Sequence, residues 1–522
     1  LKFNYLFSCK MTLTFPDTFS KSFLINLFFS LIISFLTLPD RYSFTQSKIT
    51  NEQPSGKVLA KIGSEEITVE DFLYRSEFTV RPARFKNKNT TLNNLISEKI
   101  LAMEAEYRNT NLLKNPVFLG NLKGIKEQLM REKLYELKAA DKVVLDSNEV
   151  FQKYKTSVRE YEVEFYVIAN DSSSEDIGET LRRYPGSADS IFKSLKNKLG
   201  KKPLKKVKYL DPDDENITES LFSSLLDTGV VIGPIKLQNG DHILMRVNNW
   251  KDEILFSGED QKTRWKKVAE KIHLTNSLKL WGEFIAEVMK GKKIDYNEEV
   301  FFKLANHAYR YYQGINQPPD SIELRITEIP KLEEAVNLKS PFFNINGDVW
   351  SVEDFKQELI SHPLVYRARF SDQKTFNQQF FFAVSDMVRD HFLNKEAYKL
   401  SLDTLKDINK TVGIWRDSYL AVDQQKNILN SALEKGIIHN EDNIGKQNYW
   451  ESYLTSLQKR YTDSIEIDNE QFKKIKLTNI DFVAVKPGVP FPSVVPGFPI
   501  LISSENLDYI KKEIKSTNYS NN

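Results

Sequence analysis

Histidine offers the widest choice of chemistry in this sequence, because an imidazole can act as a base, an acid or a metal ligand near neutral pH. The chain contains six histidines. Five stand apart from one another, without the spacing of a metal site and without a nearby cysteine: His273, His307, His362, His391 and His439. We therefore predict no metal site and no cofactor.

The sixth histidine, His242, opens a strand-like run that ends at Val247 and follows an Asn239-Gly240 turn. A single histidine in a strand is more often a structural hydrogen-bonding residue than a catalytic one. The sequence contains no phosphate-binding loop, no Gly-x-Ser-x-Gly elbow and no dinucleotide fingerprint. The motifs of nucleotide-dependent enzymes and of serine hydrolases are thus missing.

The N-terminal region predicts export from the cytoplasm. An apolar run from Phe23 to Leu38 is short for a membrane span and has the length of the apolar core of a secretory signal. We expect residues 1–46 to be either a cleaved signal peptide or an anchor in the inner membrane, and the rest of the chain to be periplasmic. Cys9, the single cysteine, precedes the run, so an exported chain would rest on its apolar cores.

Charge argues against nucleic acid as a partner. Removing residues 1–46 takes away four basic and two acidic residues, which turns 73 basic and 71 acidic residues into 69 of each. A surface of balanced charge gives no electrostatic reason to bind nucleic acid. With 28% charged and 40% hydrophobic residues, the composition favours folded domains.

The elements that would position any site are indicated by a duplicated segment. The first copy reads KIGSEEITVEDFLYRSEFTVRPARF (residues 61–85), and the second reads NINGDVWSVEDFKQELISHPLVYRARF (residues 344–370). Each copy predicts a strand, a turn at a glycine, and a helix that opens with Val-Glu-Asp-Phe after a capping residue. The copies lie 283 residues apart, counted between the matching Val-Glu-Asp-Phe motifs at 69 and 352. This spacing indicates a duplicated domain rather than a solenoid.

The alignment of the copies matches Phe72 with Phe355 and Phe85 with Phe370. We expect these aromatic side chains to be buried. Each copy continues into a long amphipathic helix, which ends near Tyr107 in the first copy and near Tyr398 in the second.

Between the copies the pattern changes to that of a small α/β domain. Residues 161–169 alternate as a strand, with Tyr161, Val163, Phe165 and Val167 on one face. The stretch LFSSLLDTGVVIGPIKLQNGDHILMRVNNW (residues 221–250) then predicts a helix, a strand, a hairpin turn and a last strand. Its Leu-x-x-Gly-x-x-x-Gly-Pro and Gly-x-His-Ile-Leu-x-x-Val patterns resemble the second half of a parvulin-type peptidyl-prolyl isomerase domain.

The segment ahead of this domain, with Ala-Lys-Ile-Gly and Ile-Thr-Val-Glu-Asp-Phe followed by Leu-Ile-x-x-Lys-Ile-Leu, resembles the N-terminal chaperone region of SurA-like periplasmic folding factors. The two resemblances together cover roughly residues 57–300. They imply a mainly helical α+β fold, in which a duplicated helical chaperone lobe carries an inserted parvulin-like domain in its first copy.

The domain boundaries follow from these patterns. We expect a first chaperone lobe at residues 57–145 and 255–303, with a parvulin-like domain at residues 146–250 between its two parts. A connection at residues 304–340 leads to a second chaperone-like lobe at residues 341–477. A Pro-rich extended tail follows at residues 478–522. Each lobe is expected to be closed by the short strand that follows its long helices, near Ile294 in the first and near Ile465 in the second.

The resemblance also implies where an isomerase site would lie. Parvulins twist an X-Pro amide in an apolar pocket that contains a pair of histidines. On the best alignment Phe165 takes the place of the first histidine and His242 that of the second. Tentative peptide-binding residues are Phe165, Leu221, Phe222, Leu225 and His242, although Leu221, Phe222 and Leu225 also suit a plain core. We expect no catalytic residue and negligible isomerase activity.

The function that follows is that of an ATP-independent periplasmic chaperone, whose partners are unfolded or nascent polypeptides, with outer-membrane proteins as the clients that the resemblance implies. Contact with the membrane is expected only through residues 1–46. Two alternatives stay open: an active peptidyl-prolyl isomerase, and a dedicated assembly subunit for a single envelope partner.

Overall fold

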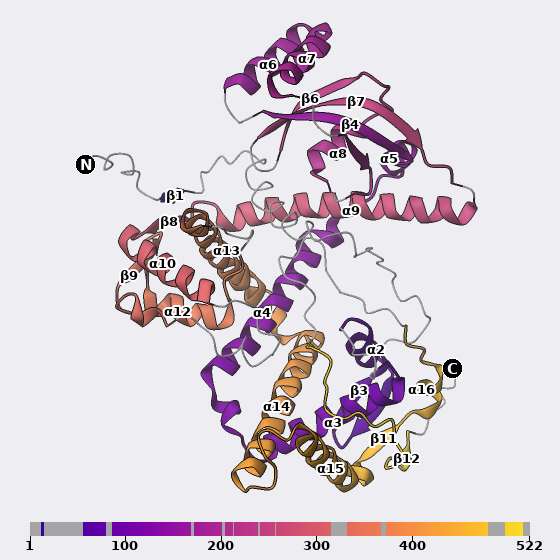
Figure 1. Cartoon of the computed structure of the whole chain (residues 1–522), viewed down its shortest axis with the longest axis vertical. Coiled ribbons are helices and arrows are strands. Elements are labelled where there is room, and N and C mark those ends of the chain that lie inside the picture. Colours follow the sequence, from indigo (N-terminus) through magenta and orange to yellow (C-terminus); the bar gives the residue numbers. More distant parts are fainter. Residues whose placement is uncertain are drawn as a thin grey trace.

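The computed structural model of the chain is mainly helical, and Figure 1 shows the arrangement of its elements. The described residues form three separate four-stranded sheets. The predicted class, mainly helical α+β, is confirmed. The structure describes residues 12–14, 56–79, 86–168, 172–200, 204–211, 213–237, 241–255, 257–314, 331–366, 372–478 and 496–514. Cys9, the apolar run 23–38, Phe85 and Phe370 lie outside the described residues. None of the helices within these ranges is long and apolar enough to span a membrane.

The first copy of the duplicated sequence forms a β-hairpin followed by two helices. Its elements are β2 (Val58–Ile62), β3 (Glu65–Thr68), α2 (Val69–Glu77) and α3 (Lys88–Tyr107). The hairpin turns at Gly63, whose φ of +61° a glycine adopts without strain. The Thr68 hydroxyl then accepts a hydrogen bond from the Asp71 N–H (3.1 Å), and the Asp71 carboxylate accepts one from the Thr68 N–H (3.0 Å). This capping box starts α2 at the predicted place.

The second copy has the same order of elements: β9 (Pro341–Ile345), β10 (Asp348–Ser351), α12 (Val352–Ser361) and α13 (Gln373–Lys399). Its hairpin turns at Asn346 and Gly347, both with positive φ, and Ser351 with Asp354 forms the capping box. Phe72 and Phe355 are both buried, as predicted.

The closing strands are exchanged between the lobes, contrary to our prediction. β11 (Ile465–Ile467) pairs antiparallel with β2 of the first copy, and β8 (Lys293–Tyr296) pairs antiparallel with β9 of the second. The apolar residues of each strand fix the choice, because Ile465 is buried in the core that contains Phe72, whereas Ile294 is buried in the core that contains Phe355.

We accordingly define two lobes by their cores. The first lobe contains β2, β3, α2, α3, β11, α15 (Asn443–Tyr461) and α16 (Asn469–Lys474). The second lobe contains β8, α10 (Glu298–Gly314), β9, β10, α12 and α13, and its sheet also takes in β1 (Thr12–Thr14). Residues 255–303, which we expected to complete the first lobe, therefore supply the closing strand of the second.

The sheet domain, residues 147–252, is an antiparallel sheet with helices on both faces. Its strand order is β5-β4-β7-β6, with β4 (Arg159–Ile168), β5 (Lys205–Lys208), β6 (Val231–Lys236) and β7 (His242–Asp252). One face packs against α6 (Ser172–Arg183) and α7 (Ala188–Leu199), and the other against α5 (Ser147–Ser157) and α8 (Glu215–Leu221).

The long helix α9 (Gly258–Met289) joins the sheet domain to the helical body, running beneath the sheet in Figure 1. Val268 and Ile272 in its first half belong to the core of the sheet domain. Trp281 and Ile285 in its second half pack with α4 (Pro116–Lys138) and α13. One helix thus contributes to two cores and fixes the sheet domain on the body.

The remaining helices connect the lobes. α14 (Lys406–Glu434) lies along α3, and α4 runs from the end of the first copy up to α9 (Figure 1). The predicted extended tail, residues 478–522, is described between 496 and 514. Most of this part is irregular, but Phe498, Leu501 and Ile502 are buried, and β12 (Lys512–Glu513) pairs parallel with β11. This part of the tail therefore packs on the first lobe.

Candidate functional site

The sheet domain places His242 and Phe165 on opposite faces of its sheet. Phe165 lies opposite Met245 on β7, and His242 lies opposite Ile168 on β4. Side chains alternate along a strand, so Met245 and Phe165 share one face while His242 and Leu244 share the other. Phe165 accordingly packs in the core with α5 and α8, whereas Leu244 packs under α6 and α7.

This geometry corrects our alignment, because two imidazoles that act together must share a face. The β4 residue that pairs with Leu244, on the face of His242, is Tyr166. Tyr166 is fully buried, stacks edge-on against Phe192 of α7 at 5.1 Å, and donates a hydrogen bond to the Gly200 carbonyl (2.9 Å). His242 is the only histidine between residues 147 and 252, so a histidine pair is missing under either alignment.

His242 borders a groove between helix α6 and the edge of the sheet. Leu181 and Arg182 of α6 line one side, and Gly233 and Pro234 of β6 line the other. A Cβ at Gly233 would lie 2.5 Å from the Ile243 carbonyl oxygen, and Gly233 has a φ of +112°, so glycine lets β6 approach β7 closely at this point. The Nδ1 atom of His242 is buried and has no hydrogen-bond partner among the described residues.

The other tentative peptide-binding residues divide into core and surface. Leu221 and Phe222 are fully buried, and the Phe222 ring packs against Tyr161 (5.3 Å) and Tyr209 (5.5 Å). They serve the core of the sheet domain and present no surface to a ligand. Leu225 is 53% exposed and lies outside that core.

One chemical role that this arrangement supports is the binding of a peptide. A groove with one imidazole can exchange a hydrogen bond with a peptide and cover a proline or leucine side chain. Rotation about an X-Pro amide has a barrier of about 18–20 kcal/mol, and lowering it requires groups that fit the twisted amide better than the planar one. The sheet domain offers His242 for that task, and Phe165, which our alignment put at the place of the first histidine, lies on the other face.

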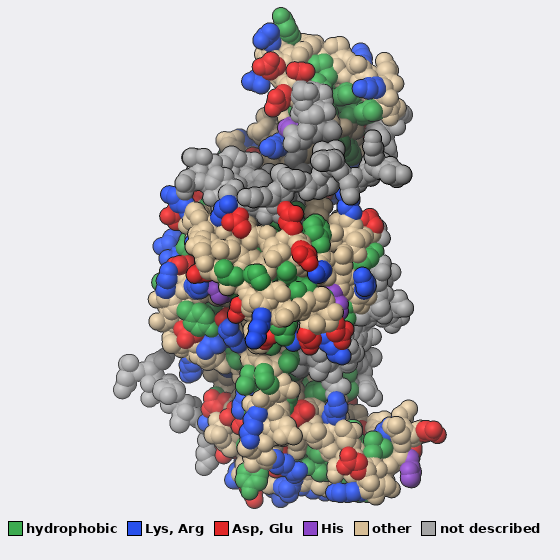
Figure 2. All heavy atoms as spheres, turned by 90° about the vertical axis from the view of Figure 1, so that its left-hand side faces the viewer, with side chains coloured by type: hydrophobic (Ala, Val, Ile, Leu, Met, Phe, Trp, Pro, Cys, Tyr) green, Lys and Arg blue, Asp and Glu red, His purple; other side chains and the backbone are tan. Residues whose placement is uncertain are grey.

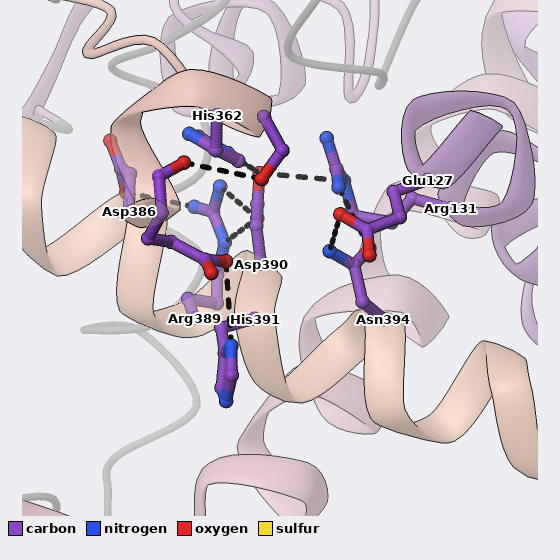
Figure 3. Close-up of polar contacts among 10 residues, drawn as sticks. Glu127, Arg131, His362, Asp386, Arg389, Asp390, His391 and Asn394 are labelled. Atoms are coloured by element: carbon purple, nitrogen blue, oxygen red, sulfur yellow. Dashed lines mark hydrogen bonds and ion pairs between the residues drawn. The ribbon is translucent and has the colours of Figure 1, made fainter. Parts of the chain in front are cut away.

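A second polar site, absent from our sequence analysis, lies where α4 meets the second lobe (Figure 3). We call it the polar junction; it consists of Glu127, Arg131, His362, Asp386, Arg389, Asp390, His391 and Asn394. Asp390 is at its centre and is 1% exposed. Its carboxylate lies 3.0 Å from His362 Nε2, 2.7 Å from Arg389 Nη2 and 3.5 Å from Arg131 Nε.

The polar junction ties α4 to the second lobe through charge. Burial by itself would raise the pKa of Asp390, but Arg389, Arg131 and His362 outweigh it and hold that pKa well below its usual range. Next to it, Asn394 accepts a hydrogen bond from Arg131 (2.8 Å) and donates one to Glu127 (3.1 Å). Both of these bonds cross from α13 to α4.

The backbones of α4 and α12 also approach each other closely at the polar junction. Gly120 and Gly124 of α4 face α12, and a Cβ at Gly124 would lie 1.9 Å from the Ser361 carbonyl oxygen. Sequence signals for this contact existed: a Gly-x-x-x-Gly pair on one helix, and Asp386, Asp390 and Asn394 spaced four apart on another. Polar residues at that spacing lie on one face of a helix and indicate that this face has a polar partner.

In comparisons with known proteins, no protein-family model and no curated protein matches this chain.

Proposed function

We propose that this protein is an ATP-independent chaperone of the periplasm that binds unfolded polypeptides, with outer-membrane proteins among its clients, and that its sheet domain is a parvulin-like domain without isomerase activity. The two lobes are, in this proposal, copies of one SurA-like chaperone lobe. Their common order of elements, their capping boxes and the matched burial of Phe72 and Phe355 support the duplication.

The observation that carries the proposal is the distribution of exposed apolar side chains over all three parts of the molecule. Tyr107 of the first lobe is 90% exposed, Val349 of the second lobe 59%, and Phe151 of the sheet domain 47%. Figure 2 shows hydrophobic side chains interspersed with both signs of charge on one face. Separate small contacts of this kind favour weak binding at several sites, which gives avidity while each contact still releases quickly.

The sheet domain also has a region of exposed aromatic side chains where it meets α9. Trp265 of α9 is 38% exposed and packs against Tyr154 of α5, with ring centroids 5.6 Å apart. Phe151 lies one turn earlier on α5 and is covered on one side by the Lys155 ammonium at 4.7 Å. Aromatic rings with a cation nearby suit the aromatic-rich segments of unfolded membrane proteins.

The test is suppression of aggregation of an unfolded outer-membrane protein by the full chain and by a form without the sheet. The chain enters and leaves the sheet at one point, because the Glu253 N–H donates a hydrogen bond to the Val158 carbonyl (2.8 Å). Residues 159–252 can therefore be replaced by a short glycine linker. We expect the shortened form to keep its helical circular dichroism and its holding activity.

Two further measurements separate the alternatives. Acceleration of X-Pro isomerisation in a short peptide that disappears in His242→Ala would establish an active isomerase. If unrelated unfolded proteins do not compete with the client for binding, the protein would be a dedicated assembly subunit. Loss of holding in the folded, shortened form would move the client site into the sheet domain.

A further inference from the structure

The C-terminal segment of residues 496–514, which we call the strap, lies on the first lobe as an irregular chain whose backbone is held by side chains. Leu501 and Ile502, at its centre, are 4% and 3% exposed and join the core of the first lobe. Leu507, Tyr509 and Ile510 pack on the same core further along. The strap is thus anchored by apolar side chains at two places.

Asn94 of α3 binds the backbone of the strap at its centre. Its Oδ1 atom accepts hydrogen bonds from the N–H groups of Leu501 (2.8 Å) and Ile502 (3.0 Å), and its Nδ2 atom donates to the Ile502 carbonyl (2.6 Å). The Trp450 indole N–H donates to the Leu501 carbonyl (2.6 Å). Side chains of the lobe therefore satisfy both backbone groups of both residues.

The same mode of contact continues on either side. Arg75 donates to the Gly497 carbonyl (3.1 Å), and Asn93 donates to the Ser504 carbonyl (2.9 Å). Partners within the lobe hold both side chains in place: Arg75 forms a buried ion pair with Glu98 (2.6 Å), and Asn93 accepts a hydrogen bond from Gln458 (2.7 Å). The contacting groups are thus fixed by the lobe as well as by the strap.

Backbone contacts of this kind do not depend on which residues the bound segment carries. Main-chain hydrogen bonds supply affinity for any extended polypeptide, and pockets for a few side chains supply selectivity. A pocket of about 240 Å³ also lies beside the strap, lined by Leu429, Trp450, Ile500 and Ser503 among others. The lobe therefore has room for side chains larger than those of the strap.

We propose that this groove between α3 and α15 is a polypeptide-binding site for extended segments with two adjacent apolar residues, and that the strap occupies it as an internal substitute for such a segment. The inference rests on the proposed chaperone function and names one of its client sites. A tethered segment competes at a high effective concentration, so a client must displace the strap. If the strap is only a part of the core, weakening the strap should leave the binding of such a segment unchanged or make it weaker.

The experiment measures binding of a fluorescein-labelled peptide with the sequence of residues 496–514 to the full chain by anisotropy. Leu501→Ala/Ile502→Ala in the protein weakens the strap and leaves the groove intact, so we expect the labelled peptide to bind about tenfold tighter or more. Adding Asn94→Ala to that variant removes the group that holds the backbone, and we expect the gain to be lost. Unlabelled peptide with aspartate at both apolar positions should not compete.

A disulfide lock tests the same point without weakening any core. Glu466 and Lys512 are paired on β11 and β12, and neighbouring strands lie within the reach of a disulfide. In a Cys9→Ser background, oxidised Glu466→Cys/Lys512→Cys should lose peptide binding and regain it on reduction. Lys61→Cys/Glu66→Cys, paired on β2 and β3 of the same sheet, is the matched control and should bind equally in both states.

The outcomes are distinguishable from those of the chaperone proposal. Unchanged or weaker peptide binding in the folded Leu501→Ala/Ile502→Ala variant would overturn the proposal that the groove binds polypeptides. Equal peptide binding in the oxidised and reduced forms of the disulfide lock would also overturn it. Both predictions for peptide binding could hold while an unfolded outer-membrane protein fails to compete with the peptide. That result would support the polypeptide-binding groove and contradict the proposed chaperone function.

Discussion

Replacing glycine by alanine should have opposite effects on the free energy of unfolding at two positions, Gly124 and Gly413. Gly124 of α4 lies against α12 in the polar junction, whereas Gly413 of α14 has open space around it. Gly124→Ala places a methyl group 1.9 Å from the carbonyl oxygen and 2.8 Å from the carbonyl carbon of Ser361. A carbon and a carbonyl oxygen ordinarily approach to about 3.3 Å. Because the clash is with backbone rather than with a flexible side chain, α4 and α12 must separate by roughly 1.4 Å.

The expected magnitude combines three effects. Alanine in a helix interior is favoured over glycine by about 0.5–1 kcal/mol. Overpacking of a close contact costs about 1–3 kcal/mol. Separation of the helices also pulls His362, the next residue after Ser361, away from Asp390, which it contacts at 3.0 Å. We therefore expect Gly124→Ala to lower the free energy of unfolding by about 1–2 kcal/mol.

Gly413→Ala in α14 is the matched control, because no atom lies within 4 Å of its added methyl group. It should raise the free energy of unfolding by about 0.4–1 kcal/mol. Urea unfolding followed by circular dichroism gives the two signs, and hydrogen exchange at the amides of α12 locates the effect at the junction. A Gly124→Ala protein as stable as Gly413→Ala, with α12 equally protected, would refute the close contact.

Two further substitutions test the core of the second lobe and the polar junction. Phe355→Ala empties a buried position of the second lobe and should cost about 3–5 kcal/mol in the free energy of unfolding, whereas Val349→Ala on the exposed face of β10 should cost under about 0.5 kcal/mol; equal effects would contradict the burial of Phe355. Asp390→Asn removes the buried carboxylate that Arg389 and Arg131 share and should cost about 3–5 kcal/mol. Because the pKa of Asp390 is held below its ordinary value, near 3.9 in unfolded chains, its stabilising contribution is complete above about pH 4 and is lost as the pH falls further. Chemical unfolding between pH 7 and pH 3 should show a steeper acid loss for the wild type than for Asp390→Asn, and parallel curves would contradict the assignment.

Local features of the fold could be predicted from the sequence because their causes are local. Thr68 and Ser351 each precede an acidic residue by three positions, and both form the capping boxes that start α2 and α12. Alternation along β4 likewise placed Tyr161 and Val163 together in one core. Such signals need only a few neighbouring residues, so a single sequence contains them.

Pairings between distant segments could not be predicted in the same way. The sequences around Ile294 and Ile465 both alternate apolar and charged residues after a long helix, so either could close either hairpin. The choice depends on which core receives the strand, and the cores form only in three dimensions. The face of His242 depends in the same manner on the register between β4 and β7, which includes a shift next to Val163.

The exchange of closing strands also explains why the groove and the strap lie on the first lobe. The second lobe is closed by β8, whose partner β9 follows within the same stretch of chain. The first lobe receives β11 from 403 residues beyond β2, counted between the paired residues Ile62 and Ile465. The strap, which comes after β11 in the chain, therefore lies next to α3, and its strand β12 adds to the same sheet beside β11. A chain that must return to complete this sheet brings the strap within reach of Asn94 and Trp450, whereas in the second lobe β1 takes the place beside the closing strand that β12 has in the first.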